Sequence, residues 1–185
     1  MALNQRLAKY PSKTSLTQKL LGWIQAVTLA TWFGSMVFVS FIGAPTAFQV
    51  VNDTRTAGAI VGGMLNKVYL MSYGVGVIVF CLWIIQFALG HLSGLRLAGL
   101  VLVLFIGLGM NVYAREVVAR RMAEIRRNID QVNNTADQQQ LRATFDRLHR
   151  YSVWLMGGSM IAGLILISAI GVGTEPRKET NRWRM

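Results

Sequence analysis

Four long apolar segments constrain the fold of this chain more than any other feature. They cover residues 20–44, 68–89, 95–113 and 153–172, and the one charged residue among them is Arg96. A hydrocarbon core about 30 Å thick is crossed by roughly 20 apolar residues in a helix. Because lipid offers no hydrogen-bond partners, each segment must pair its own backbone groups, as a helix does. The sequence therefore predicts an all-α integral membrane protein with four spans.

The rest of the chain leaves little room for a separate soluble domain. We interpret residues 1–19 as a basic lead-in to the first span and residues 173–185 as a polar C-terminal tail. The longest connection, residues 114–150, carries opposite charges at i,i+3 and i,i+4 spacing, as on a solvated helix. We therefore expect residues 20–172 to form one domain, an antiparallel four-helix transmembrane bundle. Its third and fourth helices would extend beyond the membrane as a charged hairpin.

Prolines and capping residues predict where the helices begin and end. The first helix is expected to end at Ala44–Pro45, because proline lacks a backbone donor and restricts the residue before it. Residues 52–54 (Asn-Asp-Thr) offer a cap for a helix that continues without a break over residues 55–89. Thr135 and Gln138 have the spacing of a capping box, which predicts the start of the last helix.

Charge and cysteine content exclude several classes of function. The net charge of +11 would suggest nucleic acid in a soluble protein, but these basic residues crowd the ends of the spans. There they anchor the protein to anionic headgroups, so we expect a lipid partner and no nucleic acid. Cys81 is the single cysteine, and His91 and His149 are predicted on opposite sides of the membrane. With no phosphate loop or nucleophile motif either, we expect no enzyme, no cofactor and no metal site.

Polar residues gather where the third span ends and the fourth begins. Our candidate ligand-binding residues are Asn111, Arg115, Asp146, His149 and Ser152, and Asn66 and Tyr69 lie at the same mouth of the bundle. The three on the fourth helix follow at i,i+3 spacing, so they share a face that can point at the third helix. Ionisable groups at this depth are candidates for a functional site. The alternative is a structural clasp that holds the hairpin together.

Two further patterns predict contacts between the helices. Gln25 and Gln86 fall near the other side of the membrane and can form a hydrogen bond within the bundle. Small residues recur at helix-packing spacing, which allows backbones to approach closely. The pairs are Ala30/Gly34, Gly58/Gly62, Ser159/Gly163 and Gly158/Ala162.

The polar mouth also carries a resemblance to a known family. The segment from Phe145 to Ser152, with Leu148 and His149 between them, resembles the F-x-x-L-H-x-x-S signature of the transmembrane protein 205-like family. Residues 32–34 (Trp-Phe-Gly), residues 44–48 (Ala-Pro-Thr-Ala-Phe) and Asn111 are similar to further elements of that family. The resemblance implies a small four-span membrane protein, classed as a domain of unknown function, with no established catalytic activity.

Two hypotheses for function follow. The first is a non-enzymatic membrane protein that binds a small polar ligand, a lipid headgroup or a metal complex at the polar mouth, with transport as one use. The second is an accessory subunit of a larger respiratory or photosynthetic membrane complex. An exposed small-residue face on the first or fourth span would favour the second, because a lone bundle should turn such faces inward. Either protein would lie in a bacterial inner membrane or a plasma membrane, with a homo-oligomer also open.

Overall fold

The computed structural model describes residues 16–129, 131–132 and 134–171. Within these residues the chain is entirely helical, and no strand is present. Four helical segments are long and apolar enough to cross a membrane, and they run over Leu16–Val50, Thr54–Ala88, Gly94–Ile129 and Thr135–Ile170. The predicted all-α chain with four membrane-span-like helices is thus confirmed. The C-terminal tail and most of the N-terminal lead-in lie outside the described residues.

The first segment does not break at Ala44–Pro45, so that prediction was wrong. Helix α2 (Leu16–Phe38) leads into a π-helical turn, η1 (Val39–Gly43), and then into α3 (Ala44–Val50). The Ala44 N–H donates to the Val39 carbonyl, five residues earlier, and Pro45 falls in the first turn of α3. A proline is tolerated there, because the wider π turn and the new first turn do not need its missing N–H.

The second segment is one long helix, as predicted. Helix α4 (Thr54–Ala88) has 35 residues, which is about 50 Å at 1.5 Å per residue. The Asp53 carboxylate caps it by accepting from the backbone N–H of Arg55 at 3.1 Å and of Thr56 at 2.8 Å. Gly90, with φ of +73°, makes the turn that follows, in a backbone conformation that suits glycine.

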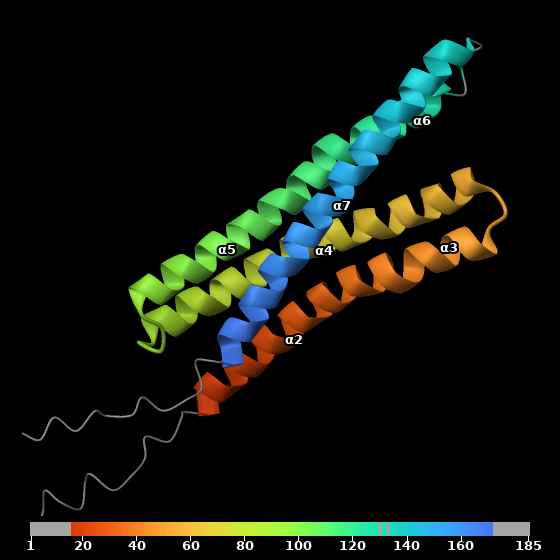
Figure 1. Ribbon diagram of the computed structural model, residues 1–185. Helices are drawn as coiled ribbons and strands as arrows, with labels where there is room; N and C mark the ends of the chain where they lie inside the picture. The colour runs from red at the N-terminus through yellow and green to blue at the C-terminus, as the bar shows by residue number, and fades with distance from the viewer. Residues whose placement is uncertain (1–15, 130, 133, 172–185) are drawn as a thin grey trace, which may run out of the picture.

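The third segment is also continuous but contains a second π-helical turn. Helix α5 (Gly94–Tyr113) is followed by η2 (Ala114–Ala119) and α6 (Arg120–Ile129). Helix α7 (Thr135–Gly171) is the last element. Figure 1 shows α6 lying beside the N-terminal part of α7, and the two are in contact.

The start of α7 is not capped by the predicted capping box of Thr135 and Gln138, but by other contacts. The Asn134 side chain accepts from the Ala136 N–H at 3.1 Å, and the Gln138 side chain donates to the Val132 carbonyl at 2.8 Å. The cap therefore lies one residue before Thr135. Asparagine fits this role because its short side chain competes well for free N–H groups of the first turn.

The four long segments pack around a shared apolar core. Helix α2 contacts α4 and α7, and α5 contacts the same two helices (Figure 1). The side chains at the centre come from all four segments and are almost fully buried: Leu29, Trp32, Met36, Val79, Trp83, Leu104 and Leu166. From Leu29 in α2 to Val39 in η1 such residues recur at alternating steps of three and four, the spacing of a coiled-coil seam.

Glycines allow the closest approaches between helices. A Cβ atom placed on Gly76 would lie 2.5 Å from a methyl carbon of Leu108. One placed on Gly107 would lie 3.1 Å from the Ala162 side chain. The Trp32 ring would be 3.2 Å from a Cβ atom on Gly163. The packing of α4, α5 and α7 thus depends on the absence of side chains at these positions.

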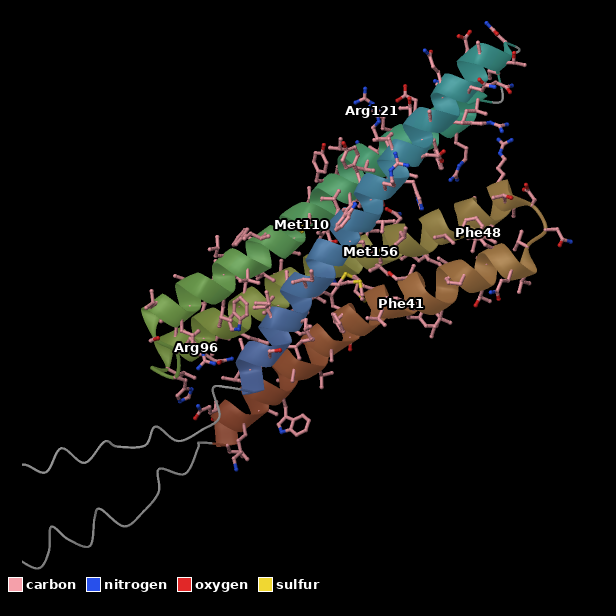
Figure 2. The ribbon with its side chains drawn as sticks, viewed as in Figure 1. Phe41, Phe48, Arg96, Met110, Arg121 and Met156 are labelled. Carbon is pink, nitrogen blue, oxygen red and sulfur yellow. The ribbon has the colours of Figure 1, made fainter. Side chains whose placement is uncertain are left out.

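Two polar contacts join helices at the end of the bundle that holds the turn at Gly90. The Gln86 side-chain amide donates to the Gln25 side-chain oxygen at 2.9 Å, which confirms the predicted pair. The Arg96 guanidinium donates to the Ala169 carbonyl at 2.6 Å, near the end of α7 (Figure 2). A cation at a helix C-terminus interacts favourably with its free carbonyl groups.

Candidate functional site

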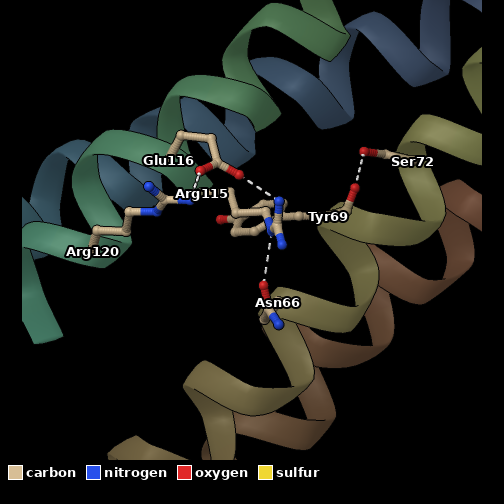
Figure 3. Close-up of polar contacts among 6 residues, drawn as sticks. All are labelled: Asn66, Tyr69, Ser72, Arg115, Glu116 and Arg120. Atoms are coloured by element: carbon tan, nitrogen blue, oxygen red, sulfur yellow. Dashed lines mark hydrogen bonds and ion pairs between the residues drawn. The ribbon is translucent and has the colours of Figure 1, made fainter.

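A group of polar and aromatic side chains joins α4 to the start of η2 (Figure 3). The Arg115 Nε donates to the Asn66 side-chain oxygen at 2.9 Å, and the Arg115 guanidinium lies 5.8 Å from the Tyr73 ring centroid. Arg115 also forms an ion pair with Glu116. We call Asn66, Tyr69, Tyr73, Arg115 and Glu116 the polar cluster.

The local sequence explains how these side chains meet. Asn66, Tyr69 and Tyr73 follow one another at i,i+3 and i,i+4 spacing, so they lie along one face of α4. Arg115 and Glu116 are adjacent residues at the beginning of η2. Their side chains are 27% and 30% exposed. Burial to that degree weakens screening by solvent, so the charges interact more strongly than a surface pair would.

Glu116 is shared between two cations. It pairs with Arg115 and also with Arg120, one turn further along (Figure 3). The i,i+4 pair with Arg120 is one that the sequence predicted. The three side chains together carry one net positive charge. The cluster therefore favours a ligand with a partial or full negative charge, or a polar group that accepts hydrogen bonds.

Asn111 lies one turn before Arg115 and is buried in the bundle. Only 1% of its surface is exposed, and neither its amide nitrogen nor its amide oxygen has a hydrogen-bond partner among the described residues. The hydroxyl of Tyr69, a residue 2% exposed, interacts with the Ser152 side chain of α7. A buried amide without a partner costs roughly 1–3 kcal/mol. The Asn111 amide therefore offers unused donors and an unused acceptor.

The structure brings together some of the five predicted site residues. Asn111 and Arg115 lie on successive turns of the same segment, and Ser152 of α7 lies next to the Tyr69 side chain. Ser152 is half-buried, whereas Asp146 and His149 are exposed. Neither of these two makes a hydrogen bond or ion pair within the described part of the chain.

The rotation of α7 explains why Asp146 and His149 are exposed. The residues that α7 turns inward at this level are Phe145 and Leu148, which are half-buried. The Arg126 guanidinium of α6 lies 5.4 Å from the Phe145 ring centroid. Burying a phenylalanine and a leucine is favourable, and burying a carboxylate and an imidazole is costly. Asp146 and His149 therefore each lie one position away from the inner face.

Two members of the polar cluster were not expected from the sequence to belong to it. Glu116 reads as part of a solvated helix because of its spacing to Arg120. Tyr73 reads as part of an aromatic belt near the end of a span. Its i,i+4 spacing to Tyr69 was the available signal, because it places both rings on the face that holds Asn66.

The cluster offers hydrogen bonds and charge rather than metal ligands. Within the described residues no group of three or more His, Cys, Asp and Glu side chains lies together. Glu116 is the one carboxylate of the cluster, and both its oxygens are engaged by arginines. What the arrangement can do chemically is attract negative charge through Arg115 and offer hydrogen bonds through the Asn111 amide.

Four membrane-span-like helices with a polar cluster at one end define a multi-pass integral membrane protein. The chain belongs to the family described as Domain of unknown function (DUF4149), whose sequence pattern matches residues 27–131. That match covers most of the first apolar segment, all of the second and third, Asn111 and the whole polar cluster. Comparison with the curated proteins and with the solved structures found no match to this chain.

Proposed function

We propose that this protein is a non-enzymatic membrane protein whose polar cluster and Asn111 bind a small polar ligand. The observation that carries the proposal is the buried Asn111 side chain, whose amide nitrogen and oxygen find no partner in the part of the chain that the structure describes. Buried polar groups in proteins are almost always paired. A ligand group that accepts from the amide nitrogen and donates to the amide oxygen would remove the cost.

Each residue of the site has a role in this proposal. Arg115 supplies positive charge, and its bonds to Asn66 and Glu116 hold it in place. Ser152 and the Tyr69 hydroxyl would contact the ligand from α7 and α4. Asp146 and His149 would act at the outer rim, where a ligand enters. A polar metabolite, a lipid headgroup and a metal complex with polar ligands all fit these groups, and transport is one use of such a site.

We infer that the four segments form an antiparallel transmembrane bundle and that η2, α6 and the first half of α7 extend beyond the membrane as a charged hairpin. The contact between α6 and α7 supports the hairpin, as does the ion pair between Glu116 and Arg120. Tyr113, Tyr151 and Trp154 have exposed side chains near the start of this hairpin. Exposed aromatic rings of this kind mark the membrane–water interface.

The experiment that tests the binding proposal compares Asn111→Leu with Asn128→Leu. Leucine removes the two unpaired groups but keeps a similar volume, and Asn128 is an exposed residue of α6 that serves as the matched control. Each full-length protein is extracted gently from its membrane and its mass is measured with bound molecules retained. We expect an adduct on the wild type and on Asn128→Leu that Asn111→Leu loses. A wild type without an adduct, or one kept by Asn111→Leu, contradicts the proposal.

The second candidate function is an accessory subunit of a larger membrane complex. Exposed residues of the first segment favour it: Ala30 and Gly34 are exposed on α2, and Phe41 and Phe48 are 70% and 49% exposed on η1 and α3 (Figure 2). An exposed small-residue face lets a helix of a partner protein approach closely, whereas exposed phenylalanines on a membrane segment can also face lipid. Recovery of the protein in a stoichiometric complex after gentle extraction would support this candidate, and recovery as a monomer or homodimer would contradict it.

Membership of the transmembrane protein 205-like family and a location in the bacterial inner membrane or plasma membrane belong to the same proposal. The resemblance of residues 145–152 and the match of the DUF4149 pattern both support a small membrane protein of this general kind. The partners we propose are anionic lipid headgroups and, in the second candidate, other membrane proteins. Nucleic acid is not among them, because the basic residues crowd the ends of the spans.

A further inference from the structure

An open groove runs between α2 and α4 on the outer surface of the bundle, away from the polar cluster. Its volume is about 460 Å³, within the range of roughly 300–1,000 Å³ that small-molecule sites occupy. A Cβ atom placed on Gly34 would meet nothing within 4 Å, so the groove is open at that point. The residues that line it come from both helices and from η1: Ala30, Thr31, Gly34, Ser35, Phe38, Val39, Met64, Lys67 and Val68.

The α2 wall of the groove is apolar despite its two hydroxyl groups. The Thr31 hydroxyl donates to the Val27 carbonyl at 2.8 Å, and the Ser35 hydroxyl donates to the Thr31 carbonyl at 2.7 Å. Both donors are therefore satisfied within α2 and do not require a polar partner. A hydrocarbon chain can lie along this wall without leaving a hydroxyl donor unpaired.

Lys67 is the one charged residue of the groove. Its side chain is exposed, and it makes no ion pair within the described part of the chain. Its neighbour Asn66 bonds to Arg115, two residues beyond Tyr113, the exposed aromatic residue that ends α5. The 20 residues of α5 measure about 30 Å, the thickness of the hydrocarbon core. If the hydrocarbon core ends at Tyr113, Lys67 lies at the headgroup level, and the groove leads from it toward the bilayer interior.

We propose that this groove binds one anionic phospholipid. Lys67 would hold the phosphate, and one acyl chain would lie along α2 from Phe38 toward Ala30. Lysine binds phosphate as a point charge, and basic residues at this level attract anionic headgroups. An apolar span of a partner protein would fill the same groove but leave the Lys67 ammonium group without a counter-charge. The proposal does not depend on a ligand being bound at the polar cluster.

The experiment measures lipid binding by the purified full-length protein. Phosphatidylglycerol and phosphatidylcholine are added in turn, and the bound lipids are counted by native mass spectrometry. We expect the wild type to bind one phosphatidylglycerol in preference to phosphatidylcholine. In Lys67→Gln this preference should fall about fivefold, which corresponds to roughly 1 kcal/mol for one lysine at an anionic headgroup. Arg121→Gln changes an exposed basic residue on α6 (Figure 2) and should keep the preference.

A second variant tests the acyl-chain half of the site. Gly34→Leu places a bulky side chain in the open groove and should reduce binding of both lipids, without changing helicity. Equal binding of the two lipids by the wild type would overturn the proposal, as would an unchanged preference in Lys67→Gln. Loss of a co-purifying protein in place of a lipid in Gly34→Leu would assign the groove to a partner span and also overturn it.

Discussion

Gly76→Ala is the sharpest test of how α4 and α5 pack. The new Cβ atom would lie 2.5 Å from one methyl carbon of Leu108, 3.2 Å from the other and 3.4 Å from its Cγ atom. Carbon atoms attract one another best at about 3.5–4.0 Å, so the Leu108 side chain or one of the helices must move. Overpacking of this kind costs about 1–3 kcal/mol. Alanine gains about 0.8–1.0 kcal/mol of helix propensity at any helical glycine, so we expect Gly76→Ala to be about 1–3 kcal/mol less stable than Gly74→Ala, which carries the same gain without the close contact.

The assay is unfolding of the full-length protein from mild detergent by sodium dodecyl sulfate, followed by helicity. Gly74→Ala is the matched control, because a Cβ atom on Gly74 meets nothing within 4 Å. A double-mutant cycle with Leu108→Ala adds a second check. Once Leu108 is shortened, Gly76→Ala should lose most of its cost, with a coupling energy of about 1–3 kcal/mol. Equal stability of Gly76→Ala and Gly74→Ala would refute the close approach of the two helices.

Three further predictions concern the ends of the helices. Gln25→Leu should destabilise the protein by about 0.6–1.7 kcal/mol, the range for a hydrogen bond between membrane helices; a cycle with Gln86→Leu that shows no coupling would contradict the pair. Arg96→Ala should speed hydrogen exchange at the C-terminal end of α7, because the Ala169 carbonyl loses its donor; unchanged exchange there would refute this contact. Hydrogen bonds from the Thr56 side chain, then from the backbone of Thr56 and Arg55, hold the pKa of Asp53 below its usual value. The capping contribution of Asp53 should therefore persist down to about pH 4 and disappear as the pH falls through its lower folded-state pKa; equal amide protection at residues 55–56 at neutral pH and at pH 2 would contradict it.

The sequence predicts where the helices lie along the chain better than it predicts which residues of each helix face the core. Spans, the cap at Asp53 and the pair between Gln25 and Gln86 depend on local composition or on simple alternation of direction, which one chain reveals directly. The π-helical turns η1 and η2 were not predicted, because a single extra residue in a turn leaves no mark on hydropathy. That is why the helix was expected to stop at Ala44–Pro45, although η1 carries it past the proline.

The candidate site shows the same limit at the level of single side chains. Asn111 could be found because polar residues are rare inside spans, and Arg115 because it follows one turn later in the same helical segment. Asp146 and His149 share a helical face with Ser152 by spacing, but spacing does not define how α7 is rotated about its axis. That rotation is set by contacts far apart in the sequence, among them Gly107 against Ala162 on α7.

The small residues show why hydrophobicity alone does not predict how α7 is rotated about its axis. In a membrane the outer face of a helix is as apolar as the inner face, so an apolar stripe no longer marks the core. Of the predicted small-residue pairs, Ser159/Gly163 is buried between helices, whereas Ala30/Gly34 is exposed on α2. The same spacing therefore has two different structural roles. On α7 it lets helices of this chain approach one another, and on α2 it leaves the open groove beside Lys67 for a molecule outside the chain.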